Sequence, residues 1–428
     1  MIACTIIARN YLAFARVLAR TYAAQHRGER IVVLVIDAEV GEPLDAAGEP
    51  FDLVRPSELA LSAAEFRQMA TIYEVTELAT AVKPWLLQLL LDRGADAALY
   101  LDPDIEVFAG LDDIAELARR HGIVLIPHAL APLPADGRKP TPQDIADAGV
   151  YNLGFIAVGP QARAFLSWWA QRLRRDCIVS VEEGLFVDQR LLDALPAYFE
   201  HTILRDPACD VAYWNLHERK VRWSGSRYEV NGSPLRFFHF SGFDPRRPDV
   251  LSKHQGDRPR TDLATEPDLA RLCREYAAQL IAAGNRQAAA QPYGFARTAA
   301  GLELDRRMRR LYREALLAAD ARNSSDLPNP FDSSAPDVFR AWLNSAHLLN
   351  SLQPIQLAAI HIESSPALRS PLLPVRVMQK VLLRLLRPLT DHQRRIDVAL
   401  LAAIRAAPLE DDNDKHGGAR PRIDKHRS

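Results

Sequence analysis

The sequence feature that most constrains the fold is an alternation of short apolar runs with helical stretches across the first half of the chain. The run Ile31–Ile36 is continuous and rich in β-branched residues, which is typical of a strand buried on both faces of a parallel sheet. Helical spacing covers Tyr11–Tyr22, between that run and an earlier one at Ile2–Ala8. Two further runs follow at Ala97–Leu101 and Gly122–Ile126. This alternation predicts an α/β fold, a mixed sheet with parallel pairs and helices on both faces.

The same reading predicts the remaining elements and a division of the chain into three regions. Further helices are expected at Ser62–Glu77, Pro84–Leu91, Leu111–Arg120, Phe165–Arg174 and Gly184–Leu195. We also expect a loop at Pro127–Gly149, a strand at Tyr151–Val158 and several short strands within residues 200–242. Helical spacing returns at Leu269–Ala283, Gly301–Ala319 and Val338–Asn350. We therefore predict an α/β domain at residues 1–256, a helical region at 257–408 and a disordered charged tail at 409–428.

Composition excludes several classes of protein. The 428 residues carry a formal net charge of −1, which gives no broad electrostatic case for binding nucleic acid. Neither a signal peptide nor an apolar run near the ~20 residues that span a bilayer is found, so we expect a cytoplasmic location. Four widely spaced cysteines form no zinc or redox pattern, which favours reduced thiols, at Cys4, Cys177, Cys209 and Cys273.

Asp102 and Asp104, separated by Pro103, come directly after the predicted strand Ala97–Leu101. In an extended chain, residues two apart point to the same side, so both carboxylates can face one point. Hard divalent cations such as Mg²⁺ or Mn²⁺ prefer these oxygen ligands and can bridge to a diphosphate. Ligands of such sheets bind outside the carboxyl ends of the strands, where Asp37 also lies. Solvated aspartates in an ordinary turn remain the alternative on spacing alone.

Other polar residues at predicted element ends are candidates for the same site. Lys83 precedes a helix start at Pro84 and could reach a phosphate as a point charge. Asn152 offers both donors and acceptors to sugar hydroxyls, and Gly154 permits close backbone approach. Taken singly, a structural role is the favoured interpretation of each, and this holds also for three further candidates, Asp188, Gln189 and His239.

Taken in chain order, these segments resemble the GT-A glycosyltransferases, especially the retaining family that includes glycogenin and the bacterial lipopolysaccharide galactosyl- and glucosyltransferases. The resemblance covers residues 1–256, which would form a GT-A nucleotide-sugar-binding catalytic domain. It implies that Mn²⁺ or Mg²⁺ is held by Asp102, Asp104 and His239. It implies nucleotide-sugar contacts from Thr5, Ala8, Asn10, Tyr11, Lys83, Asp102, Asp104, Gly154 and Gly242. It places three residues against the transferred sugar as catalytic groups, Asn152, Asp188 and Gln189.

One segment departs from the family pattern. The family's His-x-x-Gly segment often continues to Lys-Pro-Trp, whereas this chain continues from Gly242 to Phe243-Asp244-Pro245-Arg246. The phosphate-binding lysine would then be replaced by Lys253 or by Arg246. Two alternatives to glycosyl transfer are a sugar-1-phosphate nucleotidyltransferase and a non-catalytic binding protein of the same fold. The first would need a Gly-rich basic loop after the first strand, and Thr5–Asn10 contains none.

The resemblance also implies partners. These are a nucleoside-diphosphate sugar, with UDP as the expected nucleotide, and a saccharide, glycolipid or other hydroxyl-bearing acceptor of surface polysaccharide or glycoconjugate synthesis. The basic, leucine-rich stretch Val375–Arg405 could contact an anionic inner membrane surface, although a helix packed on the domain is the favoured interpretation. A homo-oligomer contact through the helical region is a further option.

Overall fold

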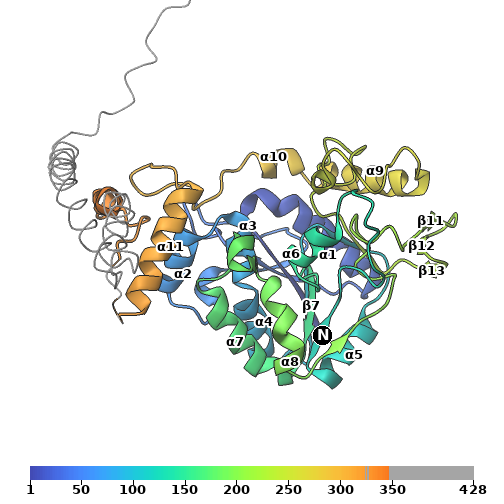
Figure 1. The fold of residues 1–428 in the computed structure, drawn as a ribbon, viewed down its shortest axis with the longest axis horizontal. Helices are drawn as coiled ribbons and strands as arrows, with labels where there is room; N and C mark the ends of the chain where they lie inside the picture. Colours follow the sequence, from blue (N-terminus) through green and yellow to red (C-terminus); the bar gives the residue numbers. More distant parts are fainter. Residues whose placement is uncertain (323, 325–326, 347–428) are drawn as a thin grey trace, which may run out of the picture. The chain divides into compact units, whose positions relative to one another are not determined.

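A computed structural model describes residues 1–322, 324 and 327–346 of the chain, and Met1–Ala346 form one compact unit (Figure 1). The predicted basic stretch Val375–Arg405 and the predicted tail from Leu409 lie outside the described residues. The last predicted helix, Val338–Asn350, lies partly within them, as a helix over residues 336–346.

The centre of the described unit is a seven-stranded mixed sheet of order β10-β6-β7-β4-β1-β2-β3. Four neighbouring strands are parallel, namely β4 (Ala98–Leu101), β1 (Ile2–Ile7), β2 (Val32–Val35) and β3 (Asp52–Val54). β7 (Phe155–Val158) runs antiparallel to β4 and β6 (Ile123–Leu125), and β10 (Thr202–Ile203) runs parallel to β6. The predicted mixed α/β sheet is therefore confirmed.

Both faces of this sheet are covered, because alternate side chains of each strand enter different apolar cores. In β1, Ala3 and Ile7 join one core, whereas Cys4 and Ile6 join the other. The first core is closed by α1 (Leu12–Gln25), α5 (Asp112–His121) and α9 (Pro267–Ala282). The second is closed by α2 (Ala63–Ile72), α3 (Val75–Ala81), α4 (Lys83–Asp92), α7 (Arg163–Leu173) and α11 (Arg306–Asp320).

Smaller strand pairs surround the large sheet. β5 (Ile105–Val107) pairs antiparallel with β14 (Phe237–His239), which places His239 opposite Ile105. A hairpin, β8 (Val179–Ser180) and β9 (Leu185–Phe186), and a three-stranded sheet complete the described strands. The three-stranded sheet consists of β11 (Val221–Trp223), β12 (Tyr228–Val230) and β13 (Ser233–Pro234).

One predicted helix and one predicted loop differ from the structure. The single helix predicted at Ser62–Glu77 is two helices, because Tyr73 is extended and Glu74 caps a new start at Val75. The backbone N–H of Glu74 donates to Glu77 Oε2 at 3.0 Å, which completes a capping box. The loop predicted at Pro127–Gly149 contains the helix α6 (Pro142–Ala148), which a second capping box between Thr141 and Asp144 starts.

The helix predicted at Gly184–Leu195 is wrong over its first half. Leu185–Phe186 form β9, and Val187 has a left-handed backbone with φ of 42°, which helix geometry excludes. A 3-10 helix then covers Arg190–Ala194, before α8 (Leu195–Tyr198). A tertiary contact explains the difference from the predicted helix. Asp188 is buried and paired with Lys83 instead of being exposed on a helix.

The described part of the region after residue 256 packs closely on the rest. The guanidinium of Arg309, in α11, donates to the carbonyls of Ala70, Thr71 and Tyr73 at the end of α2. Tyr276 of α9 stacks on Phe240 with ring centroids 3.8 Å apart. The boundary at residue 256 stays a prediction. All four cysteines are buried and free, as expected, and among the described helices none combines the length and apolarity that a membrane span requires.

Candidate active site

The Asp102-Pro103-Asp104 segment forms a tight turn at the carboxyl end of β4. The backbone N–H of Asp102 donates to the carbonyl of Gly154 at 2.7 Å, and that of Ile105 donates to the carbonyl of Asp102 at 3.1 Å. β5 begins directly after this turn, and its pairing with β14 brings His239 beside Asp104. Asp104 and His239, 135 positions apart in sequence, therefore lie side by side.

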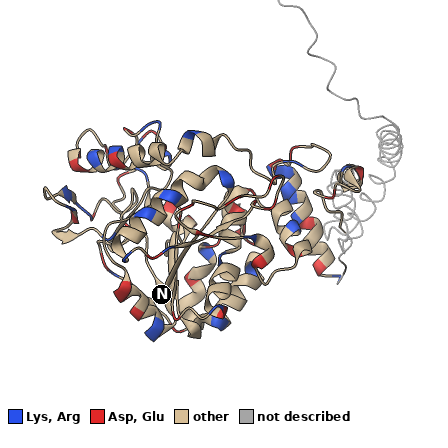
Figure 2. Cartoon of the chain, turned by 180° about the vertical axis from the view of Figure 1, so that it is seen from behind, with Lys and Arg blue, Asp and Glu red and all other residues tan. Residues whose placement is uncertain are grey.

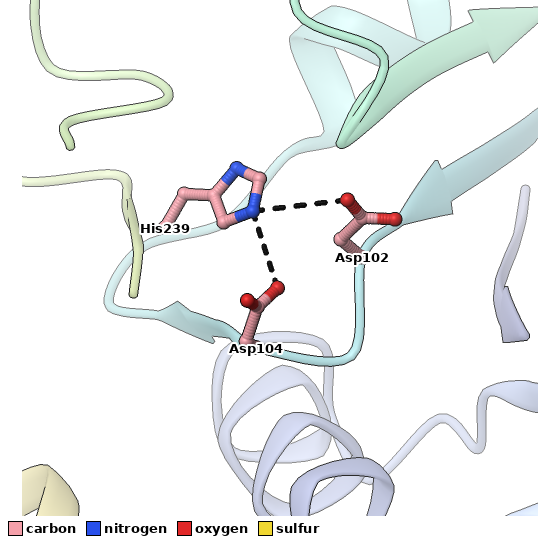
Figure 3. A group of neighbouring side chains, drawn as sticks. All are labelled: Asp102, Asp104 and His239. Atoms are coloured by element: carbon pink, nitrogen blue, oxygen red, sulfur yellow. Dashed lines mark ion pairs between the residues drawn. The ribbon is translucent and has the colours of Figure 1, made fainter. Parts of the chain in front are cut away.

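Asp102, Asp104 and His239 point toward one another (Figure 3). Nε2 of His239 lies 3.1 Å from Asp104 Oδ1 and 3.7 Å from Asp102 Oδ2. One ligand atom from each residue lies within 4.8 Å of the others, which is close enough to share one ion after small side-chain rotations. Two carboxylates and one imidazole suit Mn²⁺ and also Mg²⁺, so the residues present fit the expected divalent metal.

Asp210 completes this cluster and was missed by the sequence analysis. Its Oδ1 lies 3.3 Å from His239 Nδ1, and its side chain is fully buried. A carboxylate on the far nitrogen fixes the imidazole so that Nε2 presents a lone pair to a metal. Burial by itself lowers the pKa of His239, but Asp104 and Asp210 raise it well above its usual range. No motif marks Asp210, since only the tertiary pairing brings it near His239.

Two glycines permit the close packing of this region. A Cβ on Gly154 would lie 2.2 Å from Cε1 of His239 and 2.7 Å from Oδ1 of Asn152. Gly242 has φ of +72°, and a Cβ there would lie 2.5 Å from the ring of His254. Gly154 therefore lies against the cluster and Gly242 against His254, and each leaves room that no other residue would leave.

Lys83 is buried rather than exposed at its helix start, where it is the first residue of α4. Its Nζ lies 2.8 Å from Asp188 Oδ2, donates to the carbonyl of Leu153 at 2.7 Å and lies 3.7 Å from Asp102 Oδ1. Burial lowers the pKa of Lys83, but the carboxylates of Asp188 and Asp102 raise it above its ordinary value. Burial raises the pKa of Asp188 to about 6, against the opposing effect of Lys83. Lys83 thus ties the turn Asp102-Pro103-Asp104, which we name the metal turn because it carries two of the three candidate metal ligands, to the segment that contains Asp188.

The amides of Asn152 and Gln189 are engaged by the protein itself. Asn152 Oδ1 accepts from the N–H of Gly154 at 3.0 Å, and its Nδ2 lies 3.2 Å from His128 Nε2. Gln189 Nε2 donates to the carbonyl of Ala148 at 2.9 Å, and its Oε1 accepts from the N–H of Leu153 at 3.4 Å. Both residues therefore fix the backbone around Leu153 and Gly154, next to the metal turn.

The residues expected to contact the nucleotide follow β1. Tyr11 is 42% exposed and stacks on Phe14 with ring centroids 4.7 Å apart. Burial, with Asp104 and Asp102, raises the pKa of Tyr11 to about 12, so its hydroxyl stays protonated near neutral pH. Thr5 Oγ1 and Asn10 Oδ1 are buried without a hydrogen-bond partner among the described residues. Ala8 is buried just before Arg9.

Asp37, which follows β2, forms hydrogen bonds within the protein. Its carboxylate accepts from the N–H of Arg9 at 3.0 Å and from the N–H of Gly294 at 3.1 Å. The Arg9 guanidinium in turn donates to the carbonyls of Asp37 and Ala38. This carboxylate therefore orders the loop after β2 instead of pointing toward the metal turn.

Lys253 and Arg246 differ as candidates for a diphosphate ligand. Arg246 is paired with Asp244 at 2.7 Å and is 83% exposed. Lys253 is exposed, starts a 3-10 helix (Lys253–Gln255), and donates its N–H to the carbonyl of Gly242 at 3.0 Å. Its neighbour His254 lies against Gly242, and burial lowers the pKa of His254 while Asp104 opposes this. Of the two cations, Arg246 is therefore already paired with a carboxylate.

Comparison with solved structures finds similarity to glycosyltransferases. The galactosyltransferase LgtC, solved with donor and acceptor sugar analogues, is 18% identical, and the match covers 65% of this chain and 95% of that one with a TM-score of 0.36. The glycosyltransferase GlyE of Streptococcus pneumoniae TIGR4 is 14% identical, over 67% and 63% of the two chains, with a TM-score of 0.36. The bifunctional glycosyltransferase WbbM is 11% identical, over 66% and 51%, with a TM-score of 0.37.

Among individual proteins, the sequence is similar to two from Bacillus subtilis (strain 168). The uncharacterized protein YfnF is 26% identical over 251 residues, which are 56% of this chain and 80% of YfnF. The uncharacterized protein YfnD is 30% identical over 102 residues, which are 22% of this chain and 32% of YfnD. No protein-family model matches the sequence.

Proposed function

We propose that this protein is a divalent-metal-dependent glycosyltransferase that moves a sugar from a nucleoside-diphosphate sugar, UDP-linked in our expectation, to an acceptor hydroxyl. The observation that carries the proposal is the convergence of Asp102, Asp104 and His239 at the carboxyl edge of the parallel strands. The buried partner of the imidazole, Asp210, supports it, because a solvated turn would need no such buried carboxylate.

The residues around the cluster suggest how the donor is held. Asp102, Asp104 and His239 would hold Mn²⁺ or Mg²⁺, which supplies electrostatic neutralisation of the diphosphate. The partly exposed aromatic ring of Tyr11 suits stacking by a nucleotide base, and the exposed Lys253 suits a phosphate oxygen. The engaged amides of Asn152 and Gln189 keep the backbone at Gly154 close to the metal turn.

We further propose that the reaction retains the configuration of the sugar. The bond between the anomeric carbon and the phosphate oxygen breaks, a bond to the acceptor oxygen forms, and the acceptor proton passes to the leaving diphosphate. Asp188 is poorly suited to be a covalent nucleophile, because it is 1% exposed and bound to Lys83. A role in steadying positive charge on the sugar fits its buried position better.

The experiment is a turnover assay with candidate sugar nucleotides, with Mn²⁺ and with a chelator in its place. Sugar release or transfer should need the metal and should be lost in an Asp102→Ala, Asp104→Ala double variant. An Asp92→Ala, Asp337→Ala double variant removes the same charge from exposed positions outside the cluster and should stay active. Unchanged turnover in the first double variant would overturn the proposal. In a parallel assay with a nucleoside triphosphate and a sugar 1-phosphate, release of pyrophosphate with formation of a nucleotide sugar would instead indicate a nucleotidyltransferase.

A further inference from the structure

One face of α11 lies against the segment Arg175–Glu183, which leads into Asp188. Three arginines and one aspartate of this helix are spaced three, four or seven residues apart, so they lie on the same side of it. The basic residues coloured on α11 in Figure 2 are all Arg and lie in the first half of the helix. These four residues are Arg306, Arg310, Arg313 and Asp320.

The contacts of this face reach both ends of the segment. Arg306 donates to the carbonyl of Val179 at 2.8 Å, and Arg175 pairs with Asp320 at 2.9 Å. Arg313 donates from Nε to the carbonyl of Arg175 at 2.6 Å. Its two terminal nitrogens pair at 3.1 Å with carboxylates of the segment, those of Asp176 and Glu183.

Arg310 acts through a buried carboxylate. It pairs with Glu77 Oε1 at 2.5 Å, and the same oxygen accepts from the N–H of Val179 at 3.1 Å. Glu77 is 2% exposed, and a buried carboxylate that loses its partner is costly to the folded state. Arg310 therefore holds Val179 at the start of the β8–β9 hairpin.

This hairpin sets the position of Asp188. The N–H of Val187 donates to the carbonyl of Ile178 at 3.0 Å, so the backbone just before Asp188 is tied to the backbone just before Val179. Asp188 and Gln189 follow with no intervening residue. A shift of the hairpin would move Asp188 away from Lys83 and Gln189 away from Leu153.

We propose that Arg310 and Arg313 are positioning residues that hold the segment carrying Asp188 and Gln189 against the site. This inference rests on the proposed function for its kinetic consequence, but its structural part does not. It gives α11 a role in the reaction without placing it in contact with the donor or the metal.

The test compares Arg310→Met, Arg313→Met and Arg313→Lys with Arg307→Met. Arg307 is an exposed arginine of the same helix, so its substitution makes the same change in charge. Turnover of the two Met variants should fall roughly 10- to 100-fold, because a small displacement of reacting groups costs about this much. Calorimetric affinity for UDP with Mn²⁺ should stay within about threefold, and Arg313→Lys should recover part of the turnover by keeping one ion pair.

Hydrogen exchange gives a readout that does not need activity. Amides within residues 177–190 should exchange faster in Arg310→Met and Arg313→Met than in wild type, and Arg307→Met should match wild type. If the Met variants fail to fold, Glu183→Gln removes a half-exposed partner of Arg313 and is judged by the same measurements.

Unchanged exchange and turnover in the folded variants would overturn the positioning role. A loss of turnover matched by an equal loss of UDP affinity would also overturn it, because the effect would then not be confined to the Asp188 segment. If wild type transfers no sugar from any nucleotide sugar tested, the proposed function fails, and hydrogen exchange still decides the positioning of the segment.

Discussion

Asp210 Oδ1 lies 3.3 Å from Nδ1 of His239, on the opposite side of the imidazole from Asp104. Removing that charge leaves the metal-facing residues in place but makes the imidazole a weaker ligand. We expect Asp210→Asn to lower Mn²⁺ affinity roughly 10- to 100-fold, the usual effect of losing an outer partner of a metal ligand. Calorimetry checks this. Asp206→Asn, in the same loop but without contact to His239, should bind Mn²⁺ like wild type.

Gly154→Ala should displace the imidazole of His239 from its position beside Asp104. The new Cβ would lie 2.2 Å from Cε1 of His239, and neither the ring nor the backbone can absorb this overlap without moving. We expect a loss of roughly 1–3 kcal/mol in unfolding free energy together with weaker Mn²⁺ binding. Gly110→Ala, whose Cβ would meet nothing nearer than 3.4 Å, is the control. A wild-type metal affinity in Gly154→Ala would contradict the geometry described for His239.

Lys83→Met should destabilise the protein, and the effect should depend on pH. It leaves Asp188 buried without its ammonium partner, a change that typically costs about 3–5 kcal/mol. In the folded state the pKa of Asp188 is already raised to about 6, and loss of Lys83 removes an effect that lowers it. A raised carboxyl pKa gives stability at low pH that is lost as pH rises through it. Denaturant unfolding should therefore show a larger destabilisation at pH 8 than at pH 5.

Truncation should show whether residues 1–256 are sufficient for folding. Among the residues removed, Leu269, Leu272 and Leu280 are buried in the core that α1 and the sheet share. Their burial is worth about 5–9 kcal/mol together, comparable with the whole stability of a domain, about 5–15 kcal/mol. We expect a chain ending at residue 256 to lack a cooperative unfolding transition in circular dichroism. A chain ending at residue 346 should retain one, and a stable 1–256 fragment would contradict this.

The sequence predicted the frame of the site well, because strand periodicity and strand ends are local properties. Ile31–Ile36 and Ala97–Leu101 could be recognised as buried strands from their own residues, and Asp102 with Asp104 followed from the second. The β8–β9 hairpin could not be recognised in this way, because residues 184–195 have helical spacing. The structure differs because Asp188 is buried in an ion pair with Lys83, 105 positions away. The role of Asp210 could not be predicted for the same reason, since its partner His239 lies 29 positions away and meets it only in the folded chain.

The pairing of β5 with β14 also sets when the site can exist. Both aspartates lie within the first quarter of the chain, whereas His239 comes after its midpoint. During synthesis, a chain that has passed residue 104 carries two of the three candidate ligands, and the third joins them only when β14 has emerged and paired with β5. Under the proposed function, cation capture by the emerging chain would therefore follow long-range strand pairing instead of guiding it.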